Sequence, residues 1–277
     1  TIGNQSGQEW AEKIISELKS MPNVIVKNRS QVFGYYDHNM LVMSERISDH
    51  LPKTEKYIPK QRLWYIRAKE VIISSGSIER PLVFGNNDTP GVMLSSAAKE
   101  YLKIYGVLVG KKPLVFTNND SGYETAIEFK KNGVDPIVLD TRKDPNSEII
   151  KEAKDLNINI KPSYVVVAAK GYKKVSSADI AKISDDKKNI SNIENIKCDC
   201  ICVSGFWTPT IHLASQSGNK TKFNEEIDAF IPSKSKQKET TLGSANGIFT
   251  LEDTLKTSFE KGNELSKKIT NKENKVS

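Results

Sequence analysis

Two short stretches of this 277-residue sequence combine small residues with the position that nucleotide binding requires. The apolar run 71–73 stops abruptly at Ser75-Gly76-Ser77, a pattern typical of a buried parallel strand that ends in a tight turn. In open α/β sheets, ligands bind at such carboxyl ends. The second stretch is the small-residue turn 243–247, after which a helix is expected to begin near Ile248 to Thr250. Free N–H groups there would favour a phosphate, although an ordinary turn that packs a helix on a sheet explains the residues equally well.

A third stretch has the right place for a phosphate loop but the wrong residues. A dinucleotide site is normally announced by G-x-G-x-x-G between a strand and a helix, because only glycine lets the backbone approach the pyrophosphate. The sequence 116–122 follows a predicted strand and precedes a predicted helix, but Thr, Asn and Asp stand where the glycines would be. Asp120 would also repel a phosphate. We therefore expect a nucleotide-binding fold without a working phosphate loop in this part of the chain.

The remaining reactive residues predict no catalytic residue and no metal site. Cys198, Cys200 and Cys202 alternate along a predicted strand, which would put all three thiols on one face as small buried side chains. The three histidines share no ligand or triad spacing. Glu79-Arg80 could be a functional ion pair, but a loop held by a salt bridge is the plainer explanation.

Hydrophobic periodicity and turn residues divide the chain into helices and strands. Helices are expected at 7–20, 95–105, 123–131, 147–155 and 250–265. Strands are expected at 24–26, 31–35, 40–45, 62–67, 71–73, 114–117, 136–140, 159–164, 165–168 and 198–204. Residues 176–197 are polar and are predicted to form a surface hairpin or a partly mobile segment, and the tail 266–277 is predicted to be frayed.

This order of elements predicts an α/β protein with two dinucleotide-binding domains, the second inserted in the first. The apolar strand that ends at Ser204-Gly205 repeats the pattern of the one that ends at Ser75-Gly76. We expect a first, partial nucleotide-binding domain in 1–110 and 206–277, without its G-x-G-x-x-G unit. An inserted Rossmann-like domain with the degenerate phosphate loop is expected in 111–205.

Composition argues against several classes of partner. The net charge is +7, but lysine is distributed beside acidic residues in almost every segment, which is typical of a solvated surface rather than of a nucleic-acid site. No run of about 18 apolar residues is present, so we expect no membrane association. Residues 1–20 contain no signal-peptide core, and we expect a cytoplasmic protein.

Several motifs, taken in order, resemble the alpha subunit of heterotetrameric sarcosine oxidase. They are Glu79-Arg80-Pro81, the run 87–94 (Asn-Asp-Thr-Pro-Gly-Val-Met-Leu), the run 117–121 (Thr-Asn-Asn-Asp-Ser), Ser204-Gly205-Phe206-Trp207 and the turn 243–247. The resemblance extends from about residue 10 to residue 262. Alpha subunits of related amine and proline dehydrogenases are the near neighbours.

The resemblance implies a disulfide-reductase-like FAD/NAD(P) fold and a role in oxidative demethylation of sarcosine. In the family, NAD is held by the alpha subunit, FAD and FMN belong to the assembled complex, and tetrahydrofolate binds a region outside this chain. The implied partners are the beta, gamma and delta subunits, and the oxidation itself would occur on the beta subunit. By the same resemblance, the residues expected to line the NAD cleft are Val32 (near the adenine), Ser75, Gly76, Ser77, Gly243, Ser244, Ile248 and Thr250.

Two other functions remain open at this point. The chain could be part of the alpha subunit of a related amino-acid dehydrogenase of the proline type, which shares every motif quoted above. It could also be an interaction module that binds no cofactor, because the loop 117–122 is degenerate and no glycine fingerprint is present.

Overall fold

The computed structural model describes residues 2–273, which form two compact units. Unit 1 comprises residues up to Gly76 together with those from Thr210 onward, and unit 2 is the continuous segment Ser77–Pro209. The sequence predicted the boundaries of the inserted domain at 111 and 205. Residues 77–110 pack with unit 2 in the structure, and where the nucleotide-binding domains themselves divide remains a prediction.

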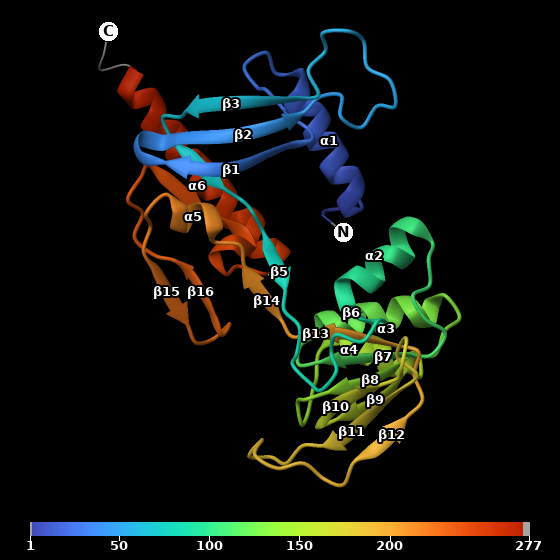
Figure 1. Cartoon of the computed structure of the whole chain (residues 1–277). Coiled ribbons are helices and arrows are strands. Elements are labelled where there is room, and N and C mark those ends of the chain that lie inside the picture. The colour runs from blue at the N-terminus through green and yellow to red at the C-terminus, as the bar shows by residue number, and fades with distance from the viewer. Residues whose placement is uncertain (1, 274–277) are drawn as a thin grey trace. The chain divides into compact units, whose positions relative to one another are not determined.

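Unit 1 combines an antiparallel meander with a small parallel pair of strands. Its helices are α1 (Gly7–Ser20), α5 (His212–Gln216) and α6 (Leu251–Glu273), with the short turns η1 (Asp37–Asn39) and η2 (Gly243–Asn246). Its strands are β1 (Ser30–Tyr36), β2 (Met40–Arg46), β3 (Gln61–Arg67), β4 (Val71–Ile73), β15 (Thr221–Asn224), β16 (Ala229–Pro232) and β17 (Glu239–Thr241). The meander has the order β1-β2-β3 (Figure 1). Strand β15 pairs with β16, and β17 runs parallel to β4.

Unit 2 is a parallel sheet covered on both faces. Its helices are α2 (Ser95–Tyr105), α3 (Ser121–Lys131) and α4 (Glu148–Asp155). Its strands are β5 (Ser77–Glu79), β6 (Val92–Leu94), β7 (Pro113–Thr117), β8 (Ile137–Asp140), β9 (Asn159–Pro162), β10 (Tyr164–Lys170), β11 (Ser177–Lys182), β12 (Glu194–Ile196), β13 (Cys200–Ser204) and β14 (Trp207–Pro209). The central sheet has the order β6-β13-β7-β8-β9, and every pair in it is parallel.

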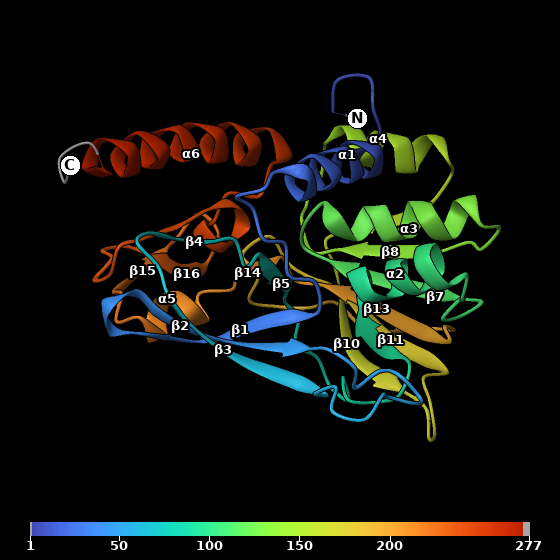
Figure 2. The same ribbon diagram turned by 90° about the horizontal axis from the view of Figure 1, so that it is seen from above.

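The central strands β7 and β13 are mostly apolar because both faces of the sheet are buried there. All five residues of β7 and of β13 are buried. Helices α3 and α4 cover one face, and the antiparallel sheet β10-β11-β12 covers the other (Figure 2). Two hydrophobic clusters result, one on each face of the sheet.

The structure corrects four of the sequence expectations. Residues 24–26 form no strand. The segment 176–197 contains the expected hairpin, in which β11 pairs antiparallel with β12, but β11 is largely buried and is neither at the surface nor a mobile segment. Cys200 and Cys202 pack in the cluster on the helical face, but Cys198 precedes the strand and packs in the opposite cluster, so the three thiols do not share a face. The tail is helical as far as residue 273, and its last four residues lie outside the described part of the chain.

No helix within residues 2–273 is both long enough and apolar enough to cross a membrane.

Candidate functional site

Four predicted site residues of unit 1 follow the ends of two neighbouring parallel strands: Ser75, Gly76, Gly243 and Ser244. Strand β17 pairs with β4 in the register Thr241 to Ile73, and the amide of Leu242 donates to the carbonyl oxygen of Ile73 at 2.9 Å. The turn at Ser75 and Gly76 therefore follows one strand, and the turn at Gly243 follows its neighbour. This is the edge of a parallel sheet at which ligands bind in α/β proteins.

The turn after β4 leaves open space above its glycine. Gly76 has φ +75°, which disfavours other residues, and a Cβ atom there would meet only the Oγ of Ser244, at 4.0 Å. The Ser75 hydroxyl donates to the carbonyl oxygen of Thr210 at 2.7 Å, and the Thr210 amide donates to the Gly76 carbonyl oxygen at 3.0 Å. The backbone is thus held firmly while the space beside Gly76 remains available to a ligand.

The turn after β17 is more tightly packed. Gly243 has φ +64°, and a Cβ atom there would lie 3.3 Å from the methyl group of Thr254 in α6. The Ile248 amide donates to the Gly243 carbonyl oxygen at 3.2 Å, so this turn closes on its own backbone. Ser244 is the residue of this turn that approaches Gly76.

Helix α6 begins with its own cap. The Thr250 hydroxyl accepts from the amide of Asp253 at 3.2 Å and donates to the Asp253 carboxylate at 2.6 Å. Glu252 and Asp253 both lie in the first turn, where their charges already interact favourably with the helix dipole. These contacts compete with a phosphate at Thr250. The remaining predicted residue, Ser77, begins β5 and belongs to unit 2.

A cavity of about 560 Å³ in unit 1 contains two of the predicted residues. Val32 and Ser75 line it, as the sequence analysis expected of a nucleotide cleft. The other lining residues are Gln31, Phe33, Thr210, His212, Leu213 and Gln216. No Asp, Glu, Lys or Arg side chain is among these described lining residues, so the cavity suits an uncharged group such as a base or a sugar.

His212 and Gln216 were not predicted as site residues from the sequence. The side-chain oxygen of Gln216 accepts from the Tyr35 amide at 2.8 Å, which joins α5 to β1. This bond fixes the amide group of Gln216 and leaves its NH2 group to donate elsewhere. His212 is the first residue of α5. His212 and Gln216 are far from Val32 in the sequence and line the same cavity only because of the fold. No local sequence pattern indicates that they do.

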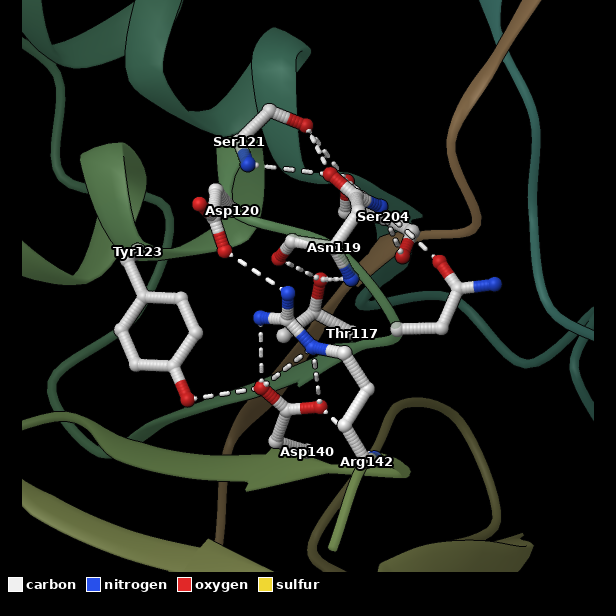
Figure 3. A network of polar contacts seen from close by, with 9 residues as sticks. Thr117, Asn119, Asp120, Ser121, Tyr123, Asp140, Arg142 and Ser204 are labelled. Atoms are coloured by element: carbon white, nitrogen blue, oxygen red, sulfur yellow. Dashed lines mark hydrogen bonds and ion pairs between the residues drawn. The ribbon is translucent and has the colours of Figure 1, made fainter. Parts of the chain in front are cut away.

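The corresponding loop of unit 2 is closed by its own side chains (Figure 3). Asn119, only 8% exposed, donates from its side chain to the Ser204 carbonyl oxygen at 3.1 Å and accepts from the Ser121 amide at 2.9 Å. The Ser121 hydroxyl also donates to the same Asn119 oxygen. Trp207 donates from its indole nitrogen to the Ser121 hydroxyl at 3.2 Å.

An ion network lies beside this loop. Arg142 contacts Asp140 from Nε (3.1 Å) and Nη2 (2.9 Å), and contacts Asp120 from Nη1 at 2.8 Å. The Tyr123 hydroxyl donates to Asp140 at 2.8 Å, and Asp140 is completely buried. Burial, together with the Asp140 charge, raises the pKa of Tyr123 well above its usual value. Burial lowers the pKa of Arg142, but its bonds to Asp140 and Asp120 outweigh this effect and the pKa is raised.

The two units therefore differ in how well they fit a nucleotide. Unit 1 has a cavity without charged side chains and an open glycine turn, whereas the loop of unit 2 is filled by Asn119 and Arg142. Within residues 2–273, no group of three or more His, Cys, Asp or Glu side chains is arranged to hold a metal ion.

In this chain a parallel sheet, unit 2, is inserted in a unit that has its own antiparallel meander and its own parallel strands ending in turns. This arrangement defines the class of proteins with two dinucleotide-binding domains. Solved structures confirm this predicted fold. Thioredoxin reductase from T. acidophilum matches with a TM-score of 0.64 and 14% identity, covering 90% of this chain and 76% of that one. L-proline dehydrogenase from P. horikoshii matches with a TM-score of 0.57 and 20% identity, covering 87% and 40%.

The particular relatives are sarcosine oxidase alpha subunits, which confirms the resemblance found in the sequence. "Sarcosine oxidase subunit alpha" of Rhizobium meliloti (strain 1021) is 35% identical over 247 residues, 88% of this chain and 24% of that protein. The protein of the same name from Corynebacterium sp. (strain U-96) is 30% identical over 250 residues, 90% and 26%. The chain thus spans about a quarter of the length of these relatives. No family model matches the chain.

Proposed function

We propose that this chain is part of the alpha subunit of a flavin-dependent oxidoreductase of the sarcosine oxidase kind, and that it contributes to NAD binding and to subunit docking. The similarity to sarcosine oxidase alpha subunits over nine-tenths of the chain supports the assignment. The observation that carries NAD binding is the unit 1 cavity, which adjoins a parallel-strand junction and has no charged side chain in its described lining.

In this proposal the cavity holds the adenosine end of the dinucleotide. The main chain at Val32 lies beside the adenine, and Ser75 and Gly76 face the sugar and the phosphates. Ser244 supplies a hydroxyl close to Gly76. Gly243 and Ile248 shape the turn that positions Ser244. NAD, when bound, would bring a nicotinamide ring able to accept a hydride.

We assign the oxidation of the substrate to a partner subunit. No predicted site residue is a carboxylate, lysine or cysteine that could act as a base or nucleophile. FAD and FMN would belong to the assembled complex with beta, gamma and delta subunits, and folate binding would belong to another part of the protein. The products would be glycine, hydrogen peroxide and formaldehyde or methylene-folate.

The binding site is tested by filling the cavity. Ser75→Trp places an indole in the cavity, and Ser74→Trp adds the same bulk at the neighbouring exposed residue, which is not among the described lining residues. Calorimetric titration with NAD and with AMP is expected to show at least tenfold weaker binding for Ser75→Trp, and binding close to wild type for Ser74→Trp.

The other results of these titrations also bear on the proposed binding site. Nicotinamide mononucleotide is expected to bind weakly, because the cavity is assigned to the adenosine end. Equal loss of AMP affinity in both tryptophan variants would contradict the assignment of this cavity. If the wild-type chain binds neither NAD nor AMP, the cofactor-free interaction module becomes the better description.

The alternative of a proline-type dehydrogenase is supported by the structural match to L-proline dehydrogenase. An activity assay of the assembled complex distinguishes the oxidase from the dehydrogenase. Hydrogen peroxide formed with sarcosine and oxygen would support the oxidase. Reduction of an artificial acceptor with proline, without peroxide, would support the dehydrogenase.

A further inference from the structure

The loop of unit 2 keeps the spacing of a dinucleotide fingerprint. Thr117, Asn119 and Gly122 stand at the three glycine positions of G-x-G-x-x-G, between β7 and α3. The third glycine of that motif permits close packing of helix and strand, and the second permits close approach of the pyrophosphate. A Cβ atom at Gly122 would lie 2.6 Å from the Cβ of Thr117, so the packing glycine is retained and the two others are replaced.

The Asn119 side chain accepts from a helix-start amide of the kind that binds a pyrophosphate in a working site. In a working site, the amides at the start of the helix bind phosphate oxygens. Here the side-chain oxygen of Asn119 accepts from the amide and the hydroxyl of Ser121, the first residue of α3. The side-chain nitrogen of Asn119 is bound to the Ser204 carbonyl oxygen, which holds the oxygen in this position.

Arg142 binds the acidic side chain at the end of β8, which in a working site would face the ribose. The acidic residue that ends the second strand of such a unit normally accepts from the ribose hydroxyl groups. Asp140 ends β8, but its carboxylate is completely buried and is bound by Arg142 and Tyr123. The second aspartate contacted by Arg142 is Asp120, in the loop before α3.

We propose that Asn119, Asp120, Asp140 and Arg142 form an internal latch that takes the place of a dinucleotide in unit 2. The latch gives the loop and the two strand ends the polar contacts that a bound nucleotide would give, so unit 2 is complete without a ligand. A dinucleotide is thereby excluded from the loop 117–122 of unit 2. The latch does not depend on the proposed function, because it involves only contacts within unit 2.

The latch is tested by removing the guanidinium group of Arg142 from the 277-residue chain. Arg142→Gln leaves the buried Asp140 carboxylate without its cation, which costs stability because a buried charge needs a partner. We expect amide exchange at 118–121 to rise at least tenfold, with no comparable change in α4. The control, Lys143→Gln, removes the neighbouring cation, which pairs with Asp185 on the surface. It is expected to leave these exchange rates within twofold of wild type.

Asp120→Asn serves as a second variant if Arg142→Gln does not fold, because it weakens the latch and leaves the Asp140–Arg142 pair in place. We expect it to raise the same exchange rates by a smaller factor. Equal exchange in the latch variant and in Lys143→Gln would overturn the latch.

The exclusion of dinucleotides is tested with the wild-type chain by nuclear Overhauser measurements, because the Trp207 indole N–H reports on this loop through Ser121. With NAD, NADH and NADPH at millimolar concentration, we expect no contact between ligand protons and the Trp207 indole or the amides of 118–121. Such contacts would overturn the proposal. Contacts to His212 concern unit 1, so their presence or absence tests the proposed function separately.

Discussion

At the scale of single residues, Glu239 shows how burial links this fold to pH. Glu239 begins β17, accepts from the Ser217 hydroxyl at 3.2 Å, and accepts from the Asn219 side chain. Burial raises its pKa above the ordinary value of 4.5, and this effect exceeds the opposite effect of the hydrogen bonds. Between pH 4.5 and the raised pKa, the folded state binds more protons than the unfolded state. The contribution of Glu239 to stability therefore falls as pH rises through this range.

Glu239→Gln is expected to remove this pH dependence. Glutamine keeps one side-chain oxygen, which can accept from Asn219, and places an NH2 group beside the Ser217 hydroxyl, but it does not titrate. The free energy of unfolding in urea, measured from pH 4.5 to pH 8, should decline less in this variant than in the wild-type chain. Glu225→Gln, at an exposed position, is the control and should follow the wild-type curve. A wild-type slope retained in Glu239→Gln would show that another group is responsible.

A site residue could be predicted from the sequence only where the neighbouring residues in the chain form a recognisable pattern. The turn at Ser75 and Gly76 was recognisable because an apolar run ends at a glycine. The roles of Gln216 and Arg142 were not recognisable. Gln216 acts through a bond to Tyr35, which lies 181 positions away in the sequence. Arg142 was indistinguishable from a surface residue until the fold placed it between Asp120 and Asp140.

At the scale of elements, Thr250 precedes helix α6 and has two possible roles, as the cap of the helix and as a phosphate ligand. A substitution can distinguish them. Thr250→Val removes the hydroxyl that accepts from the Asp253 amide and should lower the free energy of unfolding by about 1 kcal/mol. If the hydroxyl acts only as a cap, the affinity for AMP stays the same. Thr250→Ser keeps the hydroxyl and should remain close to wild type in both measurements. Loss of AMP affinity in Thr250→Val, with stability unchanged, would support the phosphate role predicted from the sequence.

The elements that the sequence predicted best are those with strong periodicity. Helix α1 was predicted with the bounds that the structure shows, and α2 likewise. Strand β11 was predicted only as part of a surface hairpin or a mobile segment, because its small and polar residues, such as Ser177 and Asp179, hide an apolar face. That face became evident only in the structure, where Ala178 and Ile180 pack in one cluster with apolar residues of β7 and β13. The strand order of the parallel sheet could not be predicted from local patterns either, because β13 lies between β6 and β7 in space but far from both in the sequence.

At the scale of the whole molecule, the chain leaves unit 1 after Gly76 and returns to it at Thr210. Unit 2 is therefore one continuous segment with two hydrophobic clusters of its own. Strands β5 and β14, which carry the chain into and out of unit 2, pair with each other. Arg80 binds the main chain of Gly205 and Phe206 beside them. Both ends of the segment are thus joined within unit 2.

This organisation predicts which fragment folds by itself. Fragment 77–209 retains β6 and α2, whereas fragment 111–205, the inserted domain expected from the sequence, lacks both. Without them, the edge of β13 that pairs with β6 is exposed, and the apolar cluster loses Ala98 and Leu102. We expect 77–209 to unfold in one cooperative transition. Fragment 111–205 should show a broad transition and bind a hydrophobic dye. A cooperative transition of equal midpoint in 111–205 would instead favour the boundaries predicted from the sequence, and would mean that β6 and α2 belong functionally to the first nucleotide-binding domain.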